Sequence, residues 1–257
     1  MTEKKSKRKR LFLIDGYATL YRSHFALIRN PLITSYGLPT SALFGFTNQV
    51  LKLLRKEKPD YLAAVFDTRE KTFRHERFPE YKATREKMPD ELQEQLPHLW
   101  NLLNAMQIIT LSKPGFEADD IIGTLAREGS NDGLDVFIVS GDKDFMQLVN
   151  DHVFLYTPGG RSMDIRIYDS KGVEEKWGVP PEKMIDFLGL MGDASDNIPG
   201  VRGVGEKSAK KLIIEFGSLE NALKNAEKNT NKRVRNGLLE CKENALLSKE
   251  LVTIDTN

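Results

Sequence analysis

The 257-residue sequence contains one cysteine, Cys241, and no long apolar run. A single cysteine cannot form an intramolecular disulfide or a cysteine-ligated metal site, and we therefore expect a reducing, cytoplasmic location. The longest apolar runs, such as 62–66 and 137–139, are far too short to span a bilayer, so no membrane partner is expected. Only four apolar residues separate the basic N-terminus from Asp15, which is too few for a secretory signal.

The sequence also has no excess of charge of either sign, because it contains 38 basic and 37 acidic residues and its net charge is +1. The distribution along the chain is uneven, however. Six of the first ten residues are basic, and seven basic residues fall between Arg69 and Lys87. Basic patches beside a separate acidic focus are typical of a protein that binds a polyanion and holds a cation, although ordinary solvated charge would give the same composition.

Short apolar runs alternate with amphipathic helical patterns over the first two thirds of the chain. Strands are predicted at 10–15, 61–67, 107–111 and 135–140, with a terminal strand pair at 152–156 and 165–168. Helices are predicted at 41–56, at 92–103 with a kink or division at Pro97, and at 117–127. This alternation predicts an α/β fold with a largely parallel central sheet that is flanked by helices.

After about residue 175 the sequence predicts short helices only, at 181–190, 206–216, 218–226 and 234–249. We therefore expect a basic tail over 1–10, an α/β domain over 11–175 and a helical region over 176–257. The closing segment 251–257 is apolar and strand-like. Such an ending suggests a piece of a longer protein.

Acidic residues recur where the predicted strands end. The set comprises Asp15, Asp67, Asp142 and Asp144 after strands, Glu117, Asp119 and Asp120 at the start of a helix, and Asp193 and Asp196 in the helical region. The carboxyl ends of parallel strands share one edge of a sheet, where ligand crevices form. The sequence therefore predicts that acids from four separate segments meet at this edge, with the last two closing over it.

Each of these acids also has an ordinary structural interpretation. Asp119 and Asp120 suit a helix N-terminus, Asp142 and Asp144 could cap a helix, and Asp193 or Asp196 could serve a turn. Capping does not require, however, that the acids gather at one edge. Two carboxylates ~4 Å apart repel by ~4 kcal/mol at an effective dielectric constant near 20, so a cluster needs protons or cations. Oxygen ligands favour Mg²⁺ or Mn²⁺, and nine acids suit a pair of ions.

Five acidic segments, in order, resemble the motifs of the 5′-nuclease superfamily, and they are 11–16, 64–67, 117–120, 140–144 and 192–197. Within this superfamily, which includes the flap endonucleases, the chain is most similar to the N-terminal 5′→3′ exonuclease domain of bacterial DNA polymerase I. The resemblance runs from residue 11 to the end. It implies a structure-specific 5′→3′ exonuclease or flap endonuclease of replication and repair, and it leaves open whether a polymerase domain follows residue 257.

The resemblance also implies two divalent ions, Mg²⁺ or Mn²⁺. The first would lie among Asp15, Asp67, Glu117 and Asp119, and the second among Asp119 or Asp120, Asp142, Asp144, Asp193 and Asp196. Asp119 and Asp142 then belong to the catalytic set, together with the basic residues Lys82 and Arg85.

The basic segment at about 70–100 resembles the arch that folds over a single-stranded 5′ end in this superfamily. Lys82 and Arg85 are three residues apart, so on a helix they would share one face and could address one phosphate. Tyr81 could stack on a base, and Arg22 is a further candidate phosphate contact. An exposed helix with local ion pairs is the alternative. We expect Lys82 to neutralise charge on the phosphoryl oxygens.

A helix-hairpin-helix element is predicted at about 185–216. Gly203 and Gly205 permit a tight turn, and the amides at the start of the next helix can hold a phosphate. Lys207, Lys210 and Lys211 follow and add charge that does not read bases. The resemblance adds a K⁺ ion at this turn.

The expected partner is DNA with a 5′ flap, a nick or a 5′ end, including an RNA primer on DNA, bound by a monomer. Two other functions stay open. A PIN-type ribonuclease is disfavoured by the helix-hairpin-helix element, which suggests a duplex-binding module. A catalytically silent DNA-structure-binding module is disfavoured by the nine acids, for which a binder of polyanions has no use.

Overall fold

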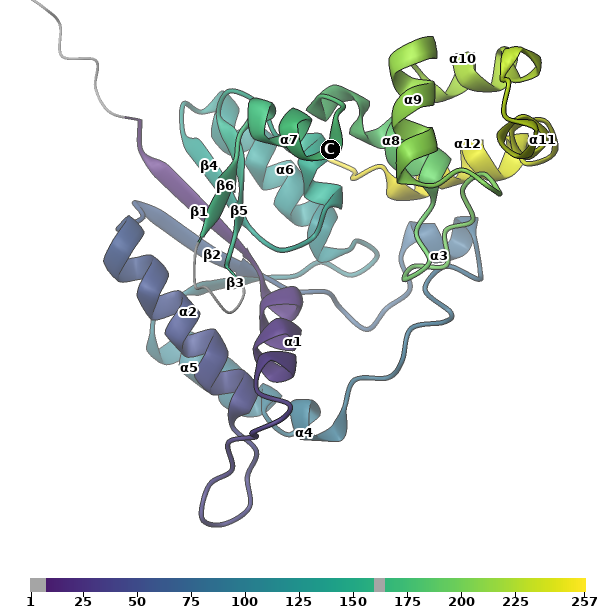
Figure 1. Ribbon diagram of the computed structural model, residues 1–257. Helices are drawn as coiled ribbons and strands as arrows, with labels where there is room; N and C mark the ends of the chain where they lie inside the picture. Colours follow the sequence, from purple (N-terminus) through teal and green to yellow (C-terminus); the bar gives the residue numbers. More distant parts are fainter. Residues whose placement is uncertain (1–7, 160–164) are drawn as a thin grey trace, which may run out of the picture.

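The computed structural model describes residues 8–159 and 165–257 and contains a twisted six-stranded sheet with helices on both faces (Figure 1). The strands are β1 Arg10–Asp15, β2 Tyr61–Val65, β3 Ile109–Leu111, β4 Asp135–Val139, β5 Val153–Thr157 and β6 Arg166–Tyr168. Their order is β3-β2-β1-β4-β5-β6, and every neighbouring pair is parallel except β5 with β6. The predicted α/β fold with a largely parallel sheet is confirmed.

The helices that accompany the sheet are α1 Gly16–Ala26, α2 Ser41–Glu57, α3 Phe73–Arg77, α4 Asp90–Gln93, α5 Leu96–Ala105, α6 Ala118–Asn131 and α7 Ser170–Trp177. The C-terminal region contains α8 Met184–Met191, α9 Glu206–Phe216, α10 Leu219–Lys224, α11 Lys232–Glu240 and α12 Lys242–Val252. Three 3-10 turns complete the described chain, at Asp144–Leu148, Pro181–Lys183 and Ala226–Lys228. Among the described residues, no helix combines the length and the apolar character needed to cross a membrane.

The side chains of β1 alternate between two apolar cores, one on each face of the sheet. Phe12 and Ile14 pack in the core that also contains residues of α1, α2 and α5. Leu13 points the other way, into a core that includes Ile122 of α6 and continues to Phe187 of α8. This second core therefore joins the sheet to the C-terminal helices.

Two details of the C-terminal half differ from the predictions. The helix expected at 234–249 is two helices, α11 and α12, which are separated by Cys241. The sequence pattern did not reveal this break, because a single interrupting residue leaves the helical periodicity almost unchanged. The segment 251–257 is not a strand, since its apolar residues Leu251 and Val252 are buried at the end of α12. The domain boundary expected near residue 175, a position within α7, stays a prediction.

The segment predicted as an arch is mostly irregular, and the expectation that Lys82 and Arg85 share a helix face is wrong. Residues 79–84 form turns and residues 85–89 have no regular structure, so only short helices flank this stretch. Pro79 lies two residues after the end of α3, and Lys82 has a left-handed backbone with φ of 57°. Both features are incompatible with a continuous helix. In Figure 1 the connection from α3 to α4 is drawn as a long irregular loop.

Arg74 of α3 ties together three parts of the chain that are distant in sequence. Its guanidinium donates to both carboxylate oxygens of Asp120 in α6, at 2.7 and 2.8 Å, and the two side chains are 3% and 2% exposed. It also donates to the carbonyl oxygens of Leu251 at 2.9 Å and Thr253 at 2.7 Å. The arch segment and the end of α12 are thus anchored on one buried ion pair.

Replacing Arg74 with Met should lower the free energy of unfolding by about 3–5 kcal/mol, because Asp120 would be left as a buried, unpaired charge. Urea denaturation followed by circular dichroism measures this change. The matched control is Arg77→Met on the same helix, where the partner Glu250 is exposed. That variant should leave the denaturation midpoint nearly unchanged. Equal effects of the two substitutions would contradict the conclusion that the buried Arg74–Asp120 ion pair anchors these segments.

Candidate active site

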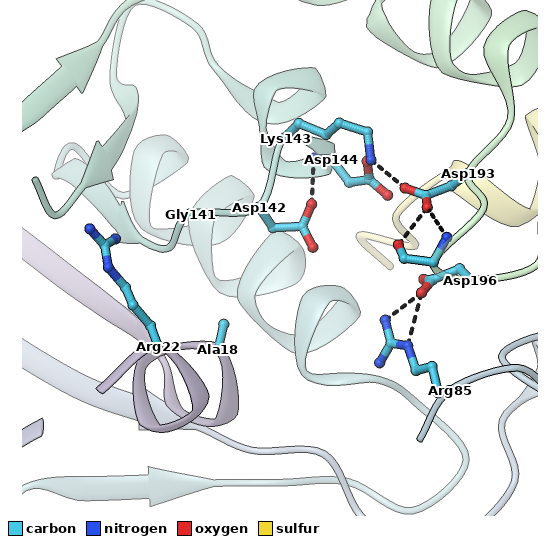
Figure 2. A pocket seen from close by; sticks show the side chains of 10 residues that line it. Ala18, Arg22, Arg85, Gly141, Asp142, Lys143, Asp144, Asp193 and Asp196 are labelled. Atoms are coloured by element: carbon cyan, nitrogen blue, oxygen red, sulfur yellow. Dashed lines mark hydrogen bonds and ion pairs between the residues drawn. The ribbon is translucent and has the colours of Figure 1, made fainter. Parts of the chain in front are cut away.

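Two neighbouring pockets lie at the carboxyl edge of the sheet, and acidic side chains line both. The first pocket, of about 540 Å³, is lined by the carboxylates of Asp15, Asp67, Glu117, Asp119 and Asp142. The second pocket, of about 400 Å³, is lined by Asp142, Asp144, Asp193 and Asp196 (Figure 2). Asp142 borders both pockets. The structure thus brings together eight of the nine acids singled out from the sequence.

In the first pocket the acids are fixed by the elements that follow their strands. Asp15 ends β1 and is the N-cap of α1, where its Oδ1 accepts a hydrogen bond from the Ala18 amide at 3.1 Å. Its Oδ2 accepts from the Ser140 hydroxyl at 2.8 Å. Asp67 follows β2, and its Oδ1 accepts from the Ala118 amide at the start of α6, at 2.9 Å. Capping therefore positions these acids rather than competing with their role in the pocket.

Glu117, the N-cap of α6, binds two residues of the arch segment. Its Oε1 accepts a hydrogen bond from Lys82 Nζ at 2.7 Å, and its Oε2 accepts from the Tyr81 hydroxyl at 3.0 Å. Tyr81 is only 4% exposed, and burial together with the charge of Glu117 raises its pKa, so the phenol keeps its proton. The expected stacking of Tyr81 on a base does not fit this buried position.

The second pocket combines the loop after β4 with the loop between α8 and α9. Asp142 accepts a hydrogen bond from the Asp144 amide at 2.9 Å. Lys143 reaches across the pocket to hydrogen-bond Asp193, as Figure 2 shows. Asp196 accepts from Arg85 Nε at 2.9 Å. Cations from two segments thus bind the acids that the C-terminal region contributes.

Burial raises the pKa of three acids in these pockets. The pKa of Asp15 rises to about 7 through burial, against the hydrogen bonds from Ser140 and the Ala18 amide. The pKa of Asp144 also rises to about 7, through burial and the charge of Asp142. Burial and the charges of Asp15 and Asp142 raise the pKa of Asp119 well above its ordinary range. The cations of the chain do not neutralise the cluster, so it needs protons or further cations.

The donor set is all oxygen, which fits Mg²⁺ or Mn²⁺ better than Zn²⁺. In the described part of the chain, no three acidic, histidine or cysteine side chains stand in an arrangement ready to hold a metal ion. The ammonium groups of Lys82 and Lys143 already bind Glu117 and Asp193. Metal binding would therefore require these cations to change partners.

Asp120 is the exception among the predicted metal ligands. It lines neither pocket, and its two oxygens are bound by Arg74 and by the amides of Glu117 at 3.1 Å and Asp255 at 2.9 Å. Successive residues of a helix point about 100° apart. Asp119 therefore faces the first pocket while Asp120 faces the protein interior, and its expected role at the second metal is corrected to a structural one.

The residues expected to contact DNA lie at the pockets and beyond them. Arg22 of α1 lines the second pocket and donates to the Gly159 carbonyl at 2.6 Å. Exposed Lys207, Lys210 and Lys211 lie on α9, after the turn that carries Gly203 and Gly205.

Gly205 is the N-cap of α9, and a Cβ atom placed there would meet open space. The packing of the protein itself therefore does not require this glycine. Its absent side chain leaves the first amides of α9 accessible to an anion. Gly203 differs, because its φ of 85° is a conformation that other residues rarely adopt.

Two residues of the site were not singled out from the sequence. Ser140 donates to Asp15, and its hydroxyl accepts from the Asp142 amide at 3.1 Å, so it links the two pockets. Lys143 stands between Asp142 and Asp144 in the chain. The position of a lysine between two acids of the motif could have identified Lys143 from the sequence. Nothing in the sequence distinguished Ser140 from other residues at strand ends.

Comparison with protein families divides the chain into two matched regions. Residues 10–178 match the 5′-3′ exonuclease N-terminal resolvase-like domain, and residues 179–257 match the 5′-3′ exonuclease C-terminal SAM fold. Among curated proteins, the chain is 45% identical over 253 residues to DNA polymerase I of Bacillus subtilis and 41% identical over 249 residues to the thermostable DNA polymerase I of Thermus filiformis. These alignments cover 98% and 97% of the chain but 28% and 29% of the relatives.

Solved structures share the fold. The bacteriophage T5 5′-exonuclease with bound zinc ions has a TM-score of 0.77 at 24% identity, covering 96% of this chain and 90% of that chain. The T5 flap endonuclease in a complex with DNA and metal ions gives the same TM-score at 22% identity, with the same coverage. The catalytic core of Rad2 in complex with DNA has a TM-score of 0.60 at 17% identity, covering 98% of this chain and 81% of that chain.

Divalent ions should stabilise the protein more strongly at high pH than at low pH. The raised pKa values of Asp15 and Asp144 mean that the folded protein keeps protons that the unfolded chain loses above about pH 4, so metal-free stability falls as the pH rises to about 7. Mg²⁺ should therefore raise the melting temperature by several degrees at about pH 8 and by less at about pH 5.5, where protons compete for the carboxylates. Scanning calorimetry with and without Mg²⁺ measures both shifts. A shift that does not grow with pH would contradict a metal site among these acids.

Proposed function

The chain belongs to the 5′-3′ exonuclease family, and from this membership we propose that its two acidic pockets form a divalent-metal-dependent centre that hydrolyses DNA phosphodiesters at 5′ ends and 5′ flaps. The observation that carries the proposal is the position of Asp142 between two pockets whose acids come from separate segments. Two cation sites that share one ligand are the arrangement of many phosphodiester-cleaving enzymes.

The residues of the pockets fit a pair of Mg²⁺ or Mn²⁺ ions. One ion would be held in the first pocket by Asp15, Asp67, Glu117 and Asp119, and the other in the second pocket by Asp144, Asp193 and Asp196, with Asp142 available to both. When bound, the ions would polarise the phosphodiester and stabilise charge on the attacking and leaving oxygens. Buried carboxylates with raised pKa values support this fit, since bound cations would favour the charged form that burial and the neighbouring carboxylates disfavour.

Lys82 is placed by the C-terminal region as well as by its own segment. Its amide donates to the Asp196 carbonyl at 2.9 Å, and its left-handed backbone costs about 1 kcal/mol or more. This fixed backbone directs the ammonium into the first pocket, where it binds Glu117. A phosphate that enters the pocket would meet the Lys82 ammonium and the Arg85 guanidinium, and both would neutralise charge on its oxygens.

The helix-hairpin-helix turn would hold the duplex next to the pockets. The amides at the start of α9 and the exposed Lys207, Lys210 and Lys211 offer contacts to phosphates, which carry no sequence information. Such contacts suit a nuclease that recognises the form of its substrate rather than its sequence. The K⁺ ion expected at this turn stays a prediction.

The chain spans about 28% of the length of its B. subtilis relative, so the activity of a larger protein is a further proposal. We propose that the chain is the 5′-nuclease region of a DNA polymerase I, which removes flaps and RNA primers in replication and repair. A PIN-type ribonuclease is less favoured, because the C-terminal region matches the 5′-3′ exonuclease SAM fold and carries the turn that we propose binds the duplex. A catalytically silent binder of DNA is less favoured too, because acids in the pockets would repel the phosphates it binds.

A labelled 5′ flap substrate tests the proposal. The protein should release short products in Mg²⁺ and none in excess EDTA. Asp142→Asn should lower the single-turnover rate at least about 10²-fold, because this carboxylate serves both pockets. The control is Asp151→Asn, which removes an exposed acid outside both pockets and should cleave normally. Cleavage that survives EDTA or Asp142→Asn would overturn the metal-dependent reaction.

The salt dependence of duplex binding tests the helix-hairpin-helix element. Changing Lys207, Lys210 and Lys211 to Glu should weaken binding of all sequences alike and reduce the slope of log K against log salt by ~0.9 for each phosphate that is no longer bound. Fluorescence anisotropy at several salt concentrations, in Ca²⁺ to limit cleavage, gives the slope. The control is Lys171→Glu, which changes an exposed residue of α7. A slope that does not change would show that the three lysines do not bind phosphates.

A further inference from the structure

Lys143 lies between two acids both in the chain and in space. Its Nζ atom hydrogen-bonds Asp193 and is 3.5 Å from Asp144 Oδ1. Figure 2 shows its side chain extending from the loop after β4, past Asp144, to the loop that follows α8. The ammonium therefore occupies the second pocket, between two of the carboxylates proposed to bind a divalent ion there.

The charges of the second pocket give this ammonium a specific function. Arg85 binds Asp196 at the opposite side of the pocket. Among the described residues, the cation that ion-pairs with Asp144 and Asp193 is Lys143. Without it, the two acids would stand beside Asp142 with no counter-charge, and their repulsion would destabilise the folded protein.

The surroundings allow the ammonium to leave without disturbing the acids. The Oδ1 atom of Asp193 accepts hydrogen bonds from the Ser195 amide at 2.7 Å and from the Ser195 hydroxyl, so Asp193 is held independently of Lys143. Asp144 Oδ1 is buried and, within the described part of the chain, accepts no hydrogen bond. Lysine is a compact charge on a flexible stem, in contrast to the planar fork of arginine. The pocket is thus preformed around a cation that can be exchanged.

We propose that the Lys143 ammonium is a tethered counter-ion of the second pocket. A divalent cation must displace this ammonium in order to bind, and the displaced ammonium then pairs with a phosphate of the bound DNA. The inference rests on the proposed function, because it assumes that this pocket binds a divalent ion. Displacement of Lys143 would couple metal binding to DNA binding. The second ion binds weakly while the ammonium is in place, and DNA, by accepting the ammonium, strengthens metal binding. The coupling is reciprocal, so the metal strengthens DNA binding equally.

Titration of the DNA-free protein with Mn²⁺, followed by electron paramagnetic resonance of the free ion, tests the displacement. Lys143→Met should bind the weaker of two Mn²⁺ ions about tenfold more tightly than the parent, equivalent to about 1.4 kcal/mol. Lys143→Arg keeps the charge and should not gain affinity. Lys224→Met is the matched control, because it changes the net charge equally at an exposed position on α10.

Thermal unfolding separates displacement from a structural role. Lys143→Met should melt below the parent without metal and should gain more from saturating Mn²⁺ than the parent does. A lysine that only stabilises the fold would lower both melting temperatures by the same amount. Addition of flap DNA should strengthen the weaker Mn²⁺ site in the parent and strengthen it less in Lys143→Met.

The outcomes distinguish the inference from the function on which it rests. A parent protein that binds no Mn²⁺ would overturn the proposed metal-dependent function. A parent that binds two ions, together with a Lys143→Met variant whose weaker site is unchanged or weakened, would overturn the role of Lys143 alone.

Discussion

Repulsion among the carboxylates at the carboxyl edge of the sheet is the constraint that the surrounding structure must meet. Helix N-termini stabilise two of the acids, because Asp15 caps α1 and Glu117 caps α6. The Ser140 hydroxyl adds a hydrogen bond to Asp15. Lysine and arginine side chains from other segments provide counter-charges. Even so, burial leaves the pKa of Asp15 at about 7, so the local structure tolerates the cluster without fully neutralising it.

The basic residues nearest the acids therefore serve two states of the protein. In the metal-free structure, Lys82 binds Glu117 and Arg85 binds Asp196. Under the proposed function, the same side chains face the phosphate once divalent ions have taken over the acids. One set of charges would thus stabilise the fold before the substrate arrives and contact the substrate afterwards, a change of partner that flexible lysine and arginine side chains allow.

The sequence predicted the parts of the site that follow from local rules. Strand ends, helix starts and their order placed Asp15, Asp67 and Glu117 correctly at one edge, because parallel topology brings such positions together. It could not predict which of two adjacent acids faces the pocket, since the rotation of α6 about its axis is set by tertiary contacts, among which Asp120 meets the buried Arg74. Tyr81 was misjudged for a similar reason, because its burial depends on the irregular path of the arch segment, which helical periodicity does not describe.

The core that runs from Leu13 of the sheet to Phe187 of α8 has a geometric consequence. The same connection is reinforced where the Lys82 amide binds the Asp196 carbonyl. These contacts pack the helix-hairpin-helix turn against the domain that carries the pockets, so under the proposed function a duplex bound by α9 would lie at a fixed offset from the acids. The position of the cut would then be measured from the duplex by the dimensions of the core rather than read from the bases.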